Sequence, residues 1–210
     1  MGEASTAEES PESLKKRIEM LESEKRELER AVVQERREAD DYYDYAQREL
    51  VGTDPFTGFV NKPAFQEELD HTLALVKRHE MRVALVMIDL DHFKQVNTDF
   101  GHQGGDGVLQ KITALFRRLI RKSDTIGRIG GEEFAIIMRG TNAQGAAKHA
   151  EDLKNEIKKL TFDGYDGLSI TASFGIASSE NSTDTKELYN LADTALNRAK
   201  DEGRDRVVSV

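Results

Sequence analysis

The pair Gly130-Gly131 constrains the fold more tightly than any other feature of the sequence, because it stands between two apolar runs. Residues 125–129 and 132–138 have the composition of strands. Two glycines between such runs are a hairpin signal, so the runs are expected to pair antiparallel. Two glutamates follow the turn directly and bring like charges to the mouth of a buried strand. The stretch is therefore either a hairpin with solvated acids at its tip or a metal and phosphate site.

The remaining periodic segments predict an α/β (α+β) domain. Helices are expected over residues 62–77, 92–99, 105–121, 142–160 and 185–202, and strands over 83–88, 168–177 and 207–208. With the hairpin, this order contains βαββαβ. Such an order is typical of a ferredoxin-like or palm-type core, in which helices flank a mainly antiparallel central sheet. A long N-terminal coiled-coil helix is expected to precede this core.

A heptad pattern predicts that coiled coil. Residues 1–12 are acidic and aperiodic and are expected to be disordered, whereas residues 13–52 are expected to form a helix for dimerisation and signalling. The seam positions, eight of which are apolar, are Leu14, Ile18, Leu21, Lys25, Leu28, Val32, Glu35, Ala39, Tyr42 and Ala46. A single helix lying on its own domain is the alternative. A helix of this length has little of its own domain to lie on, so the pattern favours a parallel homodimer.

Composition excludes several classes of protein. The chain has 210 residues, 38% of them hydrophobic and 33% charged, which suits one domain and an appendage. It contains no cysteine, so thiolate chemistry is excluded, and this fits a cytoplasmic location. The net charge is −9, and the absence of a basic stripe argues against a nucleic-acid partner. No apolar run is long enough for membrane insertion.

Acidic residues are expected to meet where the first buried strand ends and the hairpin turns. In the ferredoxin-like order, Asp89 at the end of its strand would lie near Glu132. Carboxylates with a nearby backbone carbonyl are ligands that Mg²⁺ prefers. Alternation along a strand predicts that Glu132 and Glu133 point to opposite faces and do not share one role. Capping of the helix that follows explains Asp91 equally well.

Six ordered segments resemble the GGDEF-domain diguanylate cyclases, here with the GGEEF form of the signature. They are DPFTGFVNKPAF (54–65), IDLDHFKQVN (88–97), FGHQGGDGVL (100–109), RKSDTIGRIGGEEF (121–134), ITASFGIA (170–177) and ADTALNRAKDEGRDRV (192–207). The resemblance covers about residues 54–208, and the cyclase domain is therefore expected over residues 53–210.

The resemblance implies a nucleotidyltransferase that condenses two GTP molecules into cyclic di-GMP and releases two pyrophosphates. It implies Mg²⁺ (or Mn²⁺) as the cofactor, held by Asp89 and Glu132 with help from the Leu90 carbonyl. The metal would activate the 3′-hydroxyl of one GTP for attack on the α-phosphorus of the other. Glu133 is implied as a further catalytic residue that positions the reactants or serves a second metal or the hydroxyl.

The same resemblance implies the other substrate-binding residues. They are Phe56 and Leu109 as walls of the base pocket, Asn97 and Asp106 as readers of guanine, and Phe93, Lys94, Gly130, Gly131, Lys200 and Arg204 near the phosphates. A carboxylate suits the N1–H and amino donors of guanine. Lys200 and Arg204 are four residues apart at a helix end, so they are expected to share a face and clamp the terminal phosphates.

Each of these assignments has a plainer alternative. Cations at a helix C-terminus also favour the helix dipole, which could explain Lys200 and Arg204 without a ligand. Asn97 and Asp106 could each cap a helix. Phe93 could be a core residue. The choice among these readings depends on where the helices begin and end.

Arg121 and Asp124 resemble the family's R-x-x-D motif, which binds the cyclic di-GMP product and inhibits the enzyme. Arg121 stands nine residues before Gly130, the offset that the resemblance requires. A second arginine is expected to complete the site, but the sequence does not identify it. The alternative is an arginine at a helix end followed by an aspartate that starts a turn.

The chain also departs from the family pattern. Thr98, Asn197, Asp205 and Lys62 replace the usual Asp, Tyr, Asn and Arg. None is a predicted metal ligand, so activity is expected to survive. The alternative function is a catalytically silent receptor or scaffold that binds cyclic di-GMP or GTP, and a third possibility is a cyclase for another nucleotide. The intact acidic residues argue against the silent receptor.

A homodimer is expected on chemical grounds as well. One domain offers one GTP site, whereas the product needs two GTP molecules that attack each other, so two domains must face each other. The coiled coil would hold them at high effective concentration. The activating input is expected to come from an upstream sensor domain or protein.

Overall fold

The computed structural model describes residues 12, 15–17, 20–22, 24–33, 52–79 and 81–210. The chain divides into two compact units, Met1–Leu50 and Val51–Val210. In the first unit the described residues are helical. Three seam positions there, Leu21, Leu28 and Val32, are 54%, 71% and 56% exposed. Apart from Glu12, the segment expected to be disordered lies outside the described residues, as do the other apolar seam positions.

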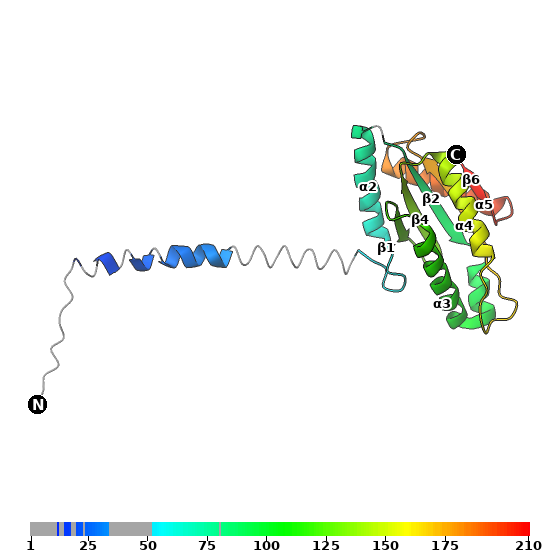
Figure 1. The fold of residues 1–210 in the computed structure, drawn as a ribbon, viewed down its shortest axis with the longest axis horizontal. Coiled ribbons are helices and arrows are strands. Elements are labelled where there is room, and N and C mark those ends of the chain that lie inside the picture. Colours follow the sequence, from blue (N-terminus) through cyan, green and yellow to red (C-terminus); the bar gives the residue numbers. More distant parts are fainter. Residues whose placement is uncertain (1–11, 13–14, 18–19, 23, 34–51, 80) are drawn as a thin grey trace, which may run out of the picture. The chain divides into compact units, whose positions relative to one another are not determined.

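A six-stranded sheet forms the centre of the second unit (Figure 1). Its strands follow the order β1 (Val60–Asn61), β3 (Thr125–Arg128), β4 (Glu133–Arg139), β2 (Val83–Leu90), β5 (Ala172–Ser178) and β6 (Val207–Ser209). The three central pairings are antiparallel and the two outer ones are parallel. The predicted βαββαβ core with a mainly antiparallel sheet is therefore confirmed, and β1 is an addition that sequence patterns did not predict.

Four helices cover the sheet in this unit. They are α2 (Lys62–His79), α3 (Phe93–Leu119), α4 (Ala143–Lys158) and α5 (Thr185–Asp201). Ala84, Val86 and Ile88 of β2 belong to the core cluster shared with α3 and α4, and the alternate residues of β2 belong to the cluster shared with α2 and α5. Each large side chain buried in these clusters contributes about 1.5–3 kcal/mol. Alternation therefore directs Asp89, the next odd position of β2, to the α2 and α5 side.

Most element boundaries lie within one or two residues of the expectation, and two features differ by more. The helices predicted over 92–99 and 105–121 form one run, which kinks at Gly101, where φ is 71°. Strand β5 begins at Ala172 instead of residue 168, because the chain turns just before it, with a left-handed Gly167 and a hydrogen bond from the Leu168 amide to the Tyr165 carbonyl. Helix α5 ends at Asp201 instead of residue 202.

Helix α5 packs directly on β5 at Gly175. A Cβ at this position would overlap the backbone of α5 at Ala192 and Leu196. Only glycine permits so close an approach between a helix and a strand. Because α5 is held this near the sheet, its C-terminal residues reach the end of the neighbouring strand β2.

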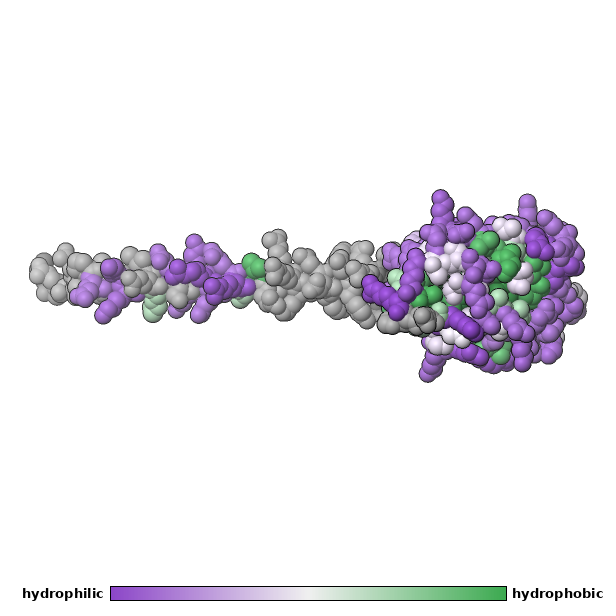
Figure 2. Space-filling model, turned by 90° about the horizontal axis from the view of Figure 1, so that it is seen from above, coloured by the Kyte–Doolittle hydropathy of each residue, from purple (hydrophilic) through white to green (hydrophobic). Residues whose placement is uncertain are grey.

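Hydrophilic side chains border the areas of apolar surface on the face seen in Figure 2. Among the described residues, no helix has both the length and the apolar character needed to cross a bilayer.

Candidate active site

The end of β2 and the hairpin turn before β4 meet, as the sequence predicts. The strand register places Asp89 opposite Glu133, and the Leu90 amide donates a hydrogen bond to the Glu132 carbonyl over 3.2 Å. Opposed residues of an antiparallel pair point to the same side of a sheet. Asp89 and Glu133 therefore both point to the side that α5 covers.

Lys200 of α5 reaches this cluster of acids. Its Nζ lies 2.7 Å from Asp89 Oδ2, and the side chains are 25% and 13% exposed. The pair joins residues 111 positions apart, and the packing of α5 on Gly175 makes it possible. A charge-assisted hydrogen bond at this distance is among the stronger polar contacts in a protein. The predicted phosphate-binding Lys200 thus lies beside the predicted metal-binding Asp89.

The Glu132 carboxyl carries a raised pKa. Burial is the largest cause, the negative charges of Asp89 and Glu133 add to it, and the positive charge of Lys200 opposes it. Strand β4 begins at Glu133, and Glu132 belongs to the turn just before it, so the opposite facing of the two side chains stays a prediction. Three carboxylates therefore repel one another at this end of the sheet, and one lysine compensates only in part.

The two turn glycines have different surroundings. A Cβ on Gly130 would overlap the carboxylate of Glu133, so the space above Gly130 belongs to that side chain. Nothing lies within 4 Å of the corresponding position on Gly131, which is exposed. Of the two glycines predicted to admit phosphate to the backbone, Gly131 has the open position.

Arg128 braces the turn, a role that sequence patterns did not reveal. Its Nη2 and Nε donate to the Gly131 carbonyl over 2.7 and 3.2 Å, and its Nη1 lies 3.2 Å from Asp54 Oδ1. Although burial opposes it, bonds from the Thr57 hydroxyl and amide and from Arg128 lower the pKa of Asp54. The guanidinium carbon also lies 5.4 Å from the centre of the Phe56 ring. The sequence offered one signal for this role, namely that Arg128 is the only charged residue in the predicted strand over 125–129.

The predicted guanine readers lie within α3. Asn97 and Asp106 are both interior to the helical run, so neither caps a helix. A Cβ on Gly105 would overlap the amide oxygen of Asn97, so that amide lies against the backbone next to Asp106. Phe93 and Leu109 are 6% and 4% exposed and belong to the core cluster on that side of the sheet.

Arg204 and Lys94 are the other basic residues predicted to lie near the phosphates. The position of Arg204 differs from the expectation. Arg204 lies beyond the end of α5 with a left-handed φ of 62°, so it does not share a helix face with Lys200. Its amide donates to the Ala199 carbonyl over 3.0 Å, which folds the chain back on the helix end. Lys94 is exposed in the first turn of α3. Both side chains remain predictions as ligands of phosphate.

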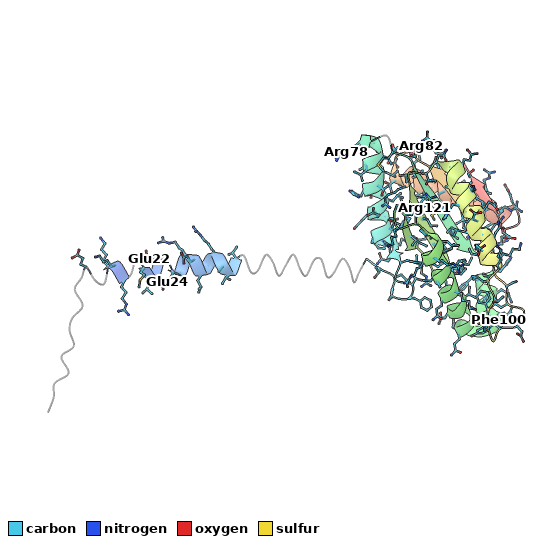
Figure 3. The ribbon with its side chains drawn as sticks, in the orientation of Figure 1. Glu22, Glu24, Arg78, Arg82, Phe100 and Arg121 are labelled. Atoms are coloured by element: carbon cyan, nitrogen blue, oxygen red, sulfur yellow. The ribbon has the colours of Figure 1, made fainter. Side chains whose placement is uncertain are left out.

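A second polar cluster lies at the other end of β4. Arg121 lines a hollow of about 290 Å³ together with Arg82 and His149, and Figure 3 shows Arg82 and Arg121 at the same end of the unit. Asp124 Oδ1 accepts the Arg139 amide over 3.2 Å, while its buried Oδ2 has no hydrogen-bond partner. Burial and the charge of Arg121 lower the pKa of His149, against the effects of Asp124 and Asp152.

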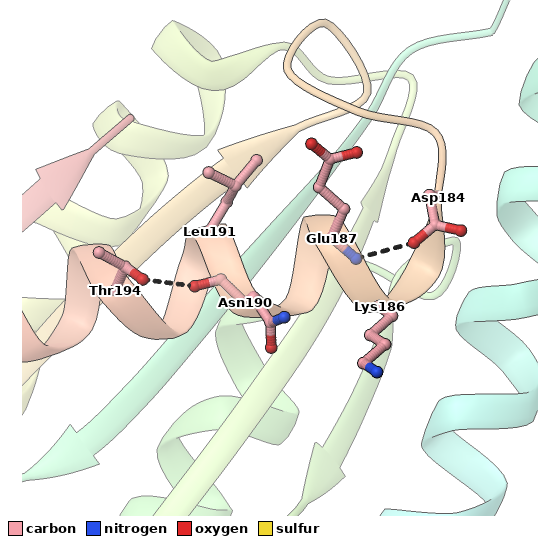
Figure 4. A pocket seen from close by; sticks show the side chains of 6 residues that line it. All are labelled: Asp184, Lys186, Glu187, Asn190, Leu191 and Thr194. Carbon is pink, nitrogen blue, oxygen red and sulfur yellow. Dashed lines mark hydrogen bonds between the residues drawn. The ribbon is translucent and has the colours of Figure 1, made fainter.

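A separate hollow of about 300 Å³ lies along the start of α5 (Figure 4). Several of its polar groups serve the helix itself. Asp184 caps the helix by accepting the Glu187 amide over 2.9 Å, and the Thr194 hydroxyl donates to the Asn190 carbonyl over 2.7 Å. The Asp184 carboxylate and the Thr194 hydroxyl are therefore engaged within the helix.

The Glu132→Gln variant is expected to be more stable than the natural chain at neutral pH without added metal. The folded-state pKa of Glu132 lies above the unfolded one, so the ionised carboxylate destabilises the folded chain above that pKa. The gain should shrink as the pH falls through the folded-state pKa and vanish below about 4.5, the ordinary value for glutamate. Thermal unfolding at several pH values measures it. Equal or lower stability of the variant at pH 7 would contradict the repulsion described above.

Known proteins share both the sequence and the fold. The sequence model of the family described as "Diguanylate cyclase, GGDEF domain" matches residues 51–206. Diguanylate cyclase DgcP of Pseudomonas aeruginosa is 39% identical over 163 residues, which cover 77% of this chain and 24% of that protein. The chain therefore spans about a quarter of the length of this relative.

Two crystal structures are similar over nearly the whole chain. The coiled coil and GGDEF domain of DgcB from Caulobacter crescentus, in complex with c-di-GMP, has a TM-score of 0.71 and 28% identity and covers 94% of this chain and 100% of that one. Diguanylate cyclase SiaD from Pseudomonas aeruginosa, in complex with its activator SiaC, has a TM-score of 0.71 and 31% identity and covers 95% of this chain and 80% of that one.

Proposed function

Because the chain belongs to the GGDEF family of diguanylate cyclases, we propose that it condenses two GTP molecules into cyclic di-GMP and releases two pyrophosphates. The observation that carries the proposal is the meeting of Asp89, Glu132 and Lys200 beside the open Gly131. Carboxylates, a lysine and an uncovered stretch of backbone are the groups that a metal-bound triphosphate requires. The chemistry needs a nucleotide pool such as that of the cytoplasm.

The residues of the site fit a divalent cation. Burial, and after it the negative charges of Asp89 and Glu133, raise the pKa of Glu132, and a bound cation would favour the ionised carboxylate against both effects. No group of three or more acidic or histidine side chains in the described parts of the chain could hold a metal by itself. We therefore infer that Asp89, Glu132 and the Leu90 carbonyl hold Mg²⁺ or Mn²⁺ together with phosphate oxygens of GTP. Such a cation, when bound, would neutralise the triphosphate and activate the 3′-hydroxyl.

The chain's own residues then orient the nucleotide. Lys200 can exchange Asp89 for phosphate oxygens without a large movement, because the two groups are already adjacent. Gly131 lets the triphosphate approach the turn, and the bonds from Arg128 to its carbonyl fix the direction of that turn. Glu133 points to the α5 side beside Asp89, where it can position the reacting hydroxyl. Lys94 and Arg204 are assigned to the phosphates.

Asn97 and Asp106 are assigned to guanine. The Asn97 amide lies against Gly105, so the two side chains can address one base. Asp106 is exposed and can accept from the N1–H and amino groups, a pair of donors that adenine does not offer at this edge. The exposed Phe56 is assigned to one wall of the pocket, and the buried Phe93 and Leu109 support it from the core.

Catalysis on this scheme requires two copies of the chain. Three apolar seam positions of the N-terminal helix expose more than half of their surface, which supports a helix that buries them against a second copy. A parallel dimer would bring two GTP sites face to face. SiaD is a relative crystallised with its activator, and we propose that an upstream domain or a partner protein likewise acts on this dimer.

Product inhibition is assigned to the hollow at Arg121. The guanidinium groups of Arg121 and Arg82 line it together and would attract the phosphates of cyclic di-GMP. The buried Asp124 Oδ2 has no partner and could accept a donor from a guanine base. Arg82 is the candidate for the second arginine that the sequence does not identify.

Incubation of the purified dimer with GTP and Mg²⁺ is expected to yield cyclic di-GMP, separated and identified by chromatography, whereas ATP yields no cyclic product. Asp89→Asn and Glu132→Gln should each lower the turnover number by about a hundredfold or more, because each removes a charge that holds the cation. Glu67→Gln, the same change on the exposed face of α2, is the control and should keep full turnover.

Failure of the dimeric natural chain to form product would contradict the proposal and favour a silent nucleotide receptor. Retained turnover in the Glu132→Gln variant would instead contradict the metal assignment alone.

The Arg121→Ala variant is expected to resist product inhibition. Loss of one guanidinium from the hollow should weaken the binding of the product. The cyclic di-GMP concentration needed to halve the rate should therefore rise about tenfold. Lys122→Ala removes the same charge from the exposed neighbouring residue and should leave inhibition unchanged. Initial rates at increasing product concentration measure both variants. Equal inhibition of Arg121→Ala and the natural chain would refute the assignment.

A further inference from the structure

Asp91 is a buried carboxylate with an unusual set of partners. It follows the last residue of β2 and is 3% exposed. Its Oδ1 accepts the Ser173 hydroxyl over 2.7 Å, and its Oδ2 accepts the Thr171 hydroxyl over 2.7 Å and the Asp205 amide over 3.1 Å. It does not cap α3, whose N-cap residue is His92. The capping role that the sequence allowed for Asp91 is therefore excluded.

The Asp205 amide belongs to the turn that carries Arg204. Gly203, Arg204 and Asp205 have φ values of 112°, 62° and 47°, so two successive residues with side chains adopt the left-handed region. Such a conformation is strained for a residue with a side chain and persists only where other contacts hold it. The Asp205 side chain contacts Lys158 of α4 over 2.6 Å, and the Asp91 carboxylate holds the Asp205 backbone.

We infer that Asp91 is a positioning residue that fixes the phosphate-binding turn 203–205 relative to Asp89. The two aspartates stand two residues apart at the end of one strand. Asp89 binds Lys200, and Asp91 binds the backbone that carries Arg204. A single strand end therefore sets the place of both basic groups and of the metal-binding carboxylate. The inference rests on the proposed assignment of Lys200 and Arg204 to the triphosphate.

A purely structural role for Asp91 predicts a different result. If the carboxylate served only the fold, its loss would lower stability and weaken every ligand alike. If it acts through Arg204, its loss weakens the contacts to the β- and γ-phosphates while the contacts to guanine remain. The effect should also disappear once Arg204 itself is removed, because two changes that act through one contact are not additive.

The test measures the affinity of 3′-deoxy-GTP, which lacks the attacking hydroxyl, and of GMP, both with Mg²⁺ and by calorimetry. Asp91→Asn keeps the shape of the side chain and removes its charge. It should weaken 3′-deoxy-GTP about tenfold and leave GMP unchanged. The double variant with Arg204→Ala should bind 3′-deoxy-GTP no more weakly than Arg204→Ala alone. Thr171→Val, which removes another donor to Asp91 but does not touch the turn, should retain the natural preference for the triphosphate.

Three outcomes would overturn the inference: an unchanged affinity of Asp91→Asn for 3′-deoxy-GTP, an equal loss for GMP, or losses that add in the double variant. If Arg204→Ala itself binds 3′-deoxy-GTP as the natural chain does, the proposed phosphate clamp fails as well. Amide hydrogen exchange in the natural chain provides a test that does not depend on the folding of a variant. The Asp205 amide should exchange slowly, and rapid exchange would overturn the anchor.

Discussion

The antiparallel pairing of β2 with β4 holds together acids that would otherwise move apart. Backbone hydrogen bonds along the pair fix Asp89 opposite Glu133 and bring the Glu132 carbonyl to the Leu90 amide. Burial, and after it the charges of Asp89 and Glu133, raise the pKa of Glu132, so the ionised carboxylate is unfavourable in this arrangement. The fold bears that cost because the strands behind the acids are buried on both faces of the sheet. Such a cluster of like charges is suited to bind the cation and nucleotide that we propose for it.

The opposing charge comes from the far end of the sequence. Helix α5 can lie close to β5 only because residue 175 is glycine, and this proximity brings Lys200 to Asp89. The chain just beyond the helix then bends through two left-handed residues and is bound by Asp91. We propose that the two aspartates at the end of β2 have distinct tasks, that of Asp89 toward the ligand and that of Asp91 toward the protein. Arg128 likewise fixes the hairpin turn, through its hydrogen bond to the Gly131 carbonyl.

Sequence patterns predicted what depends on local periodicity and turn chemistry. The glycine pair predicted the hairpin, and the order of elements predicted that Asp89 and the hairpin turn would meet. Features that depend on one residue of register or on distant partners were not predictable in this way. Glu132, for example, belongs to the turn and not to β4. Arg204 lies beyond the end of α5 in the left-handed region, so its four-residue spacing from Lys200 does not place the two on one helix face. A capping aspartate and a buried anchor such as Asp91 have the same local sequence, and only the fold distinguishes them.

We propose that Asp89, Glu132 and Lys200 form one site for a metal-bound triphosphate. A crystal structure of the chain with 3′-deoxy-GTP and Mg²⁺ tests it most directly. We expect a cation between the Asp89 and Glu132 carboxylates, with the Lys200 ammonium on a phosphate oxygen instead of on Asp89. A nucleotide bound elsewhere, with Lys200 still paired to Asp89 and no cation between the two carboxylates, would contradict it.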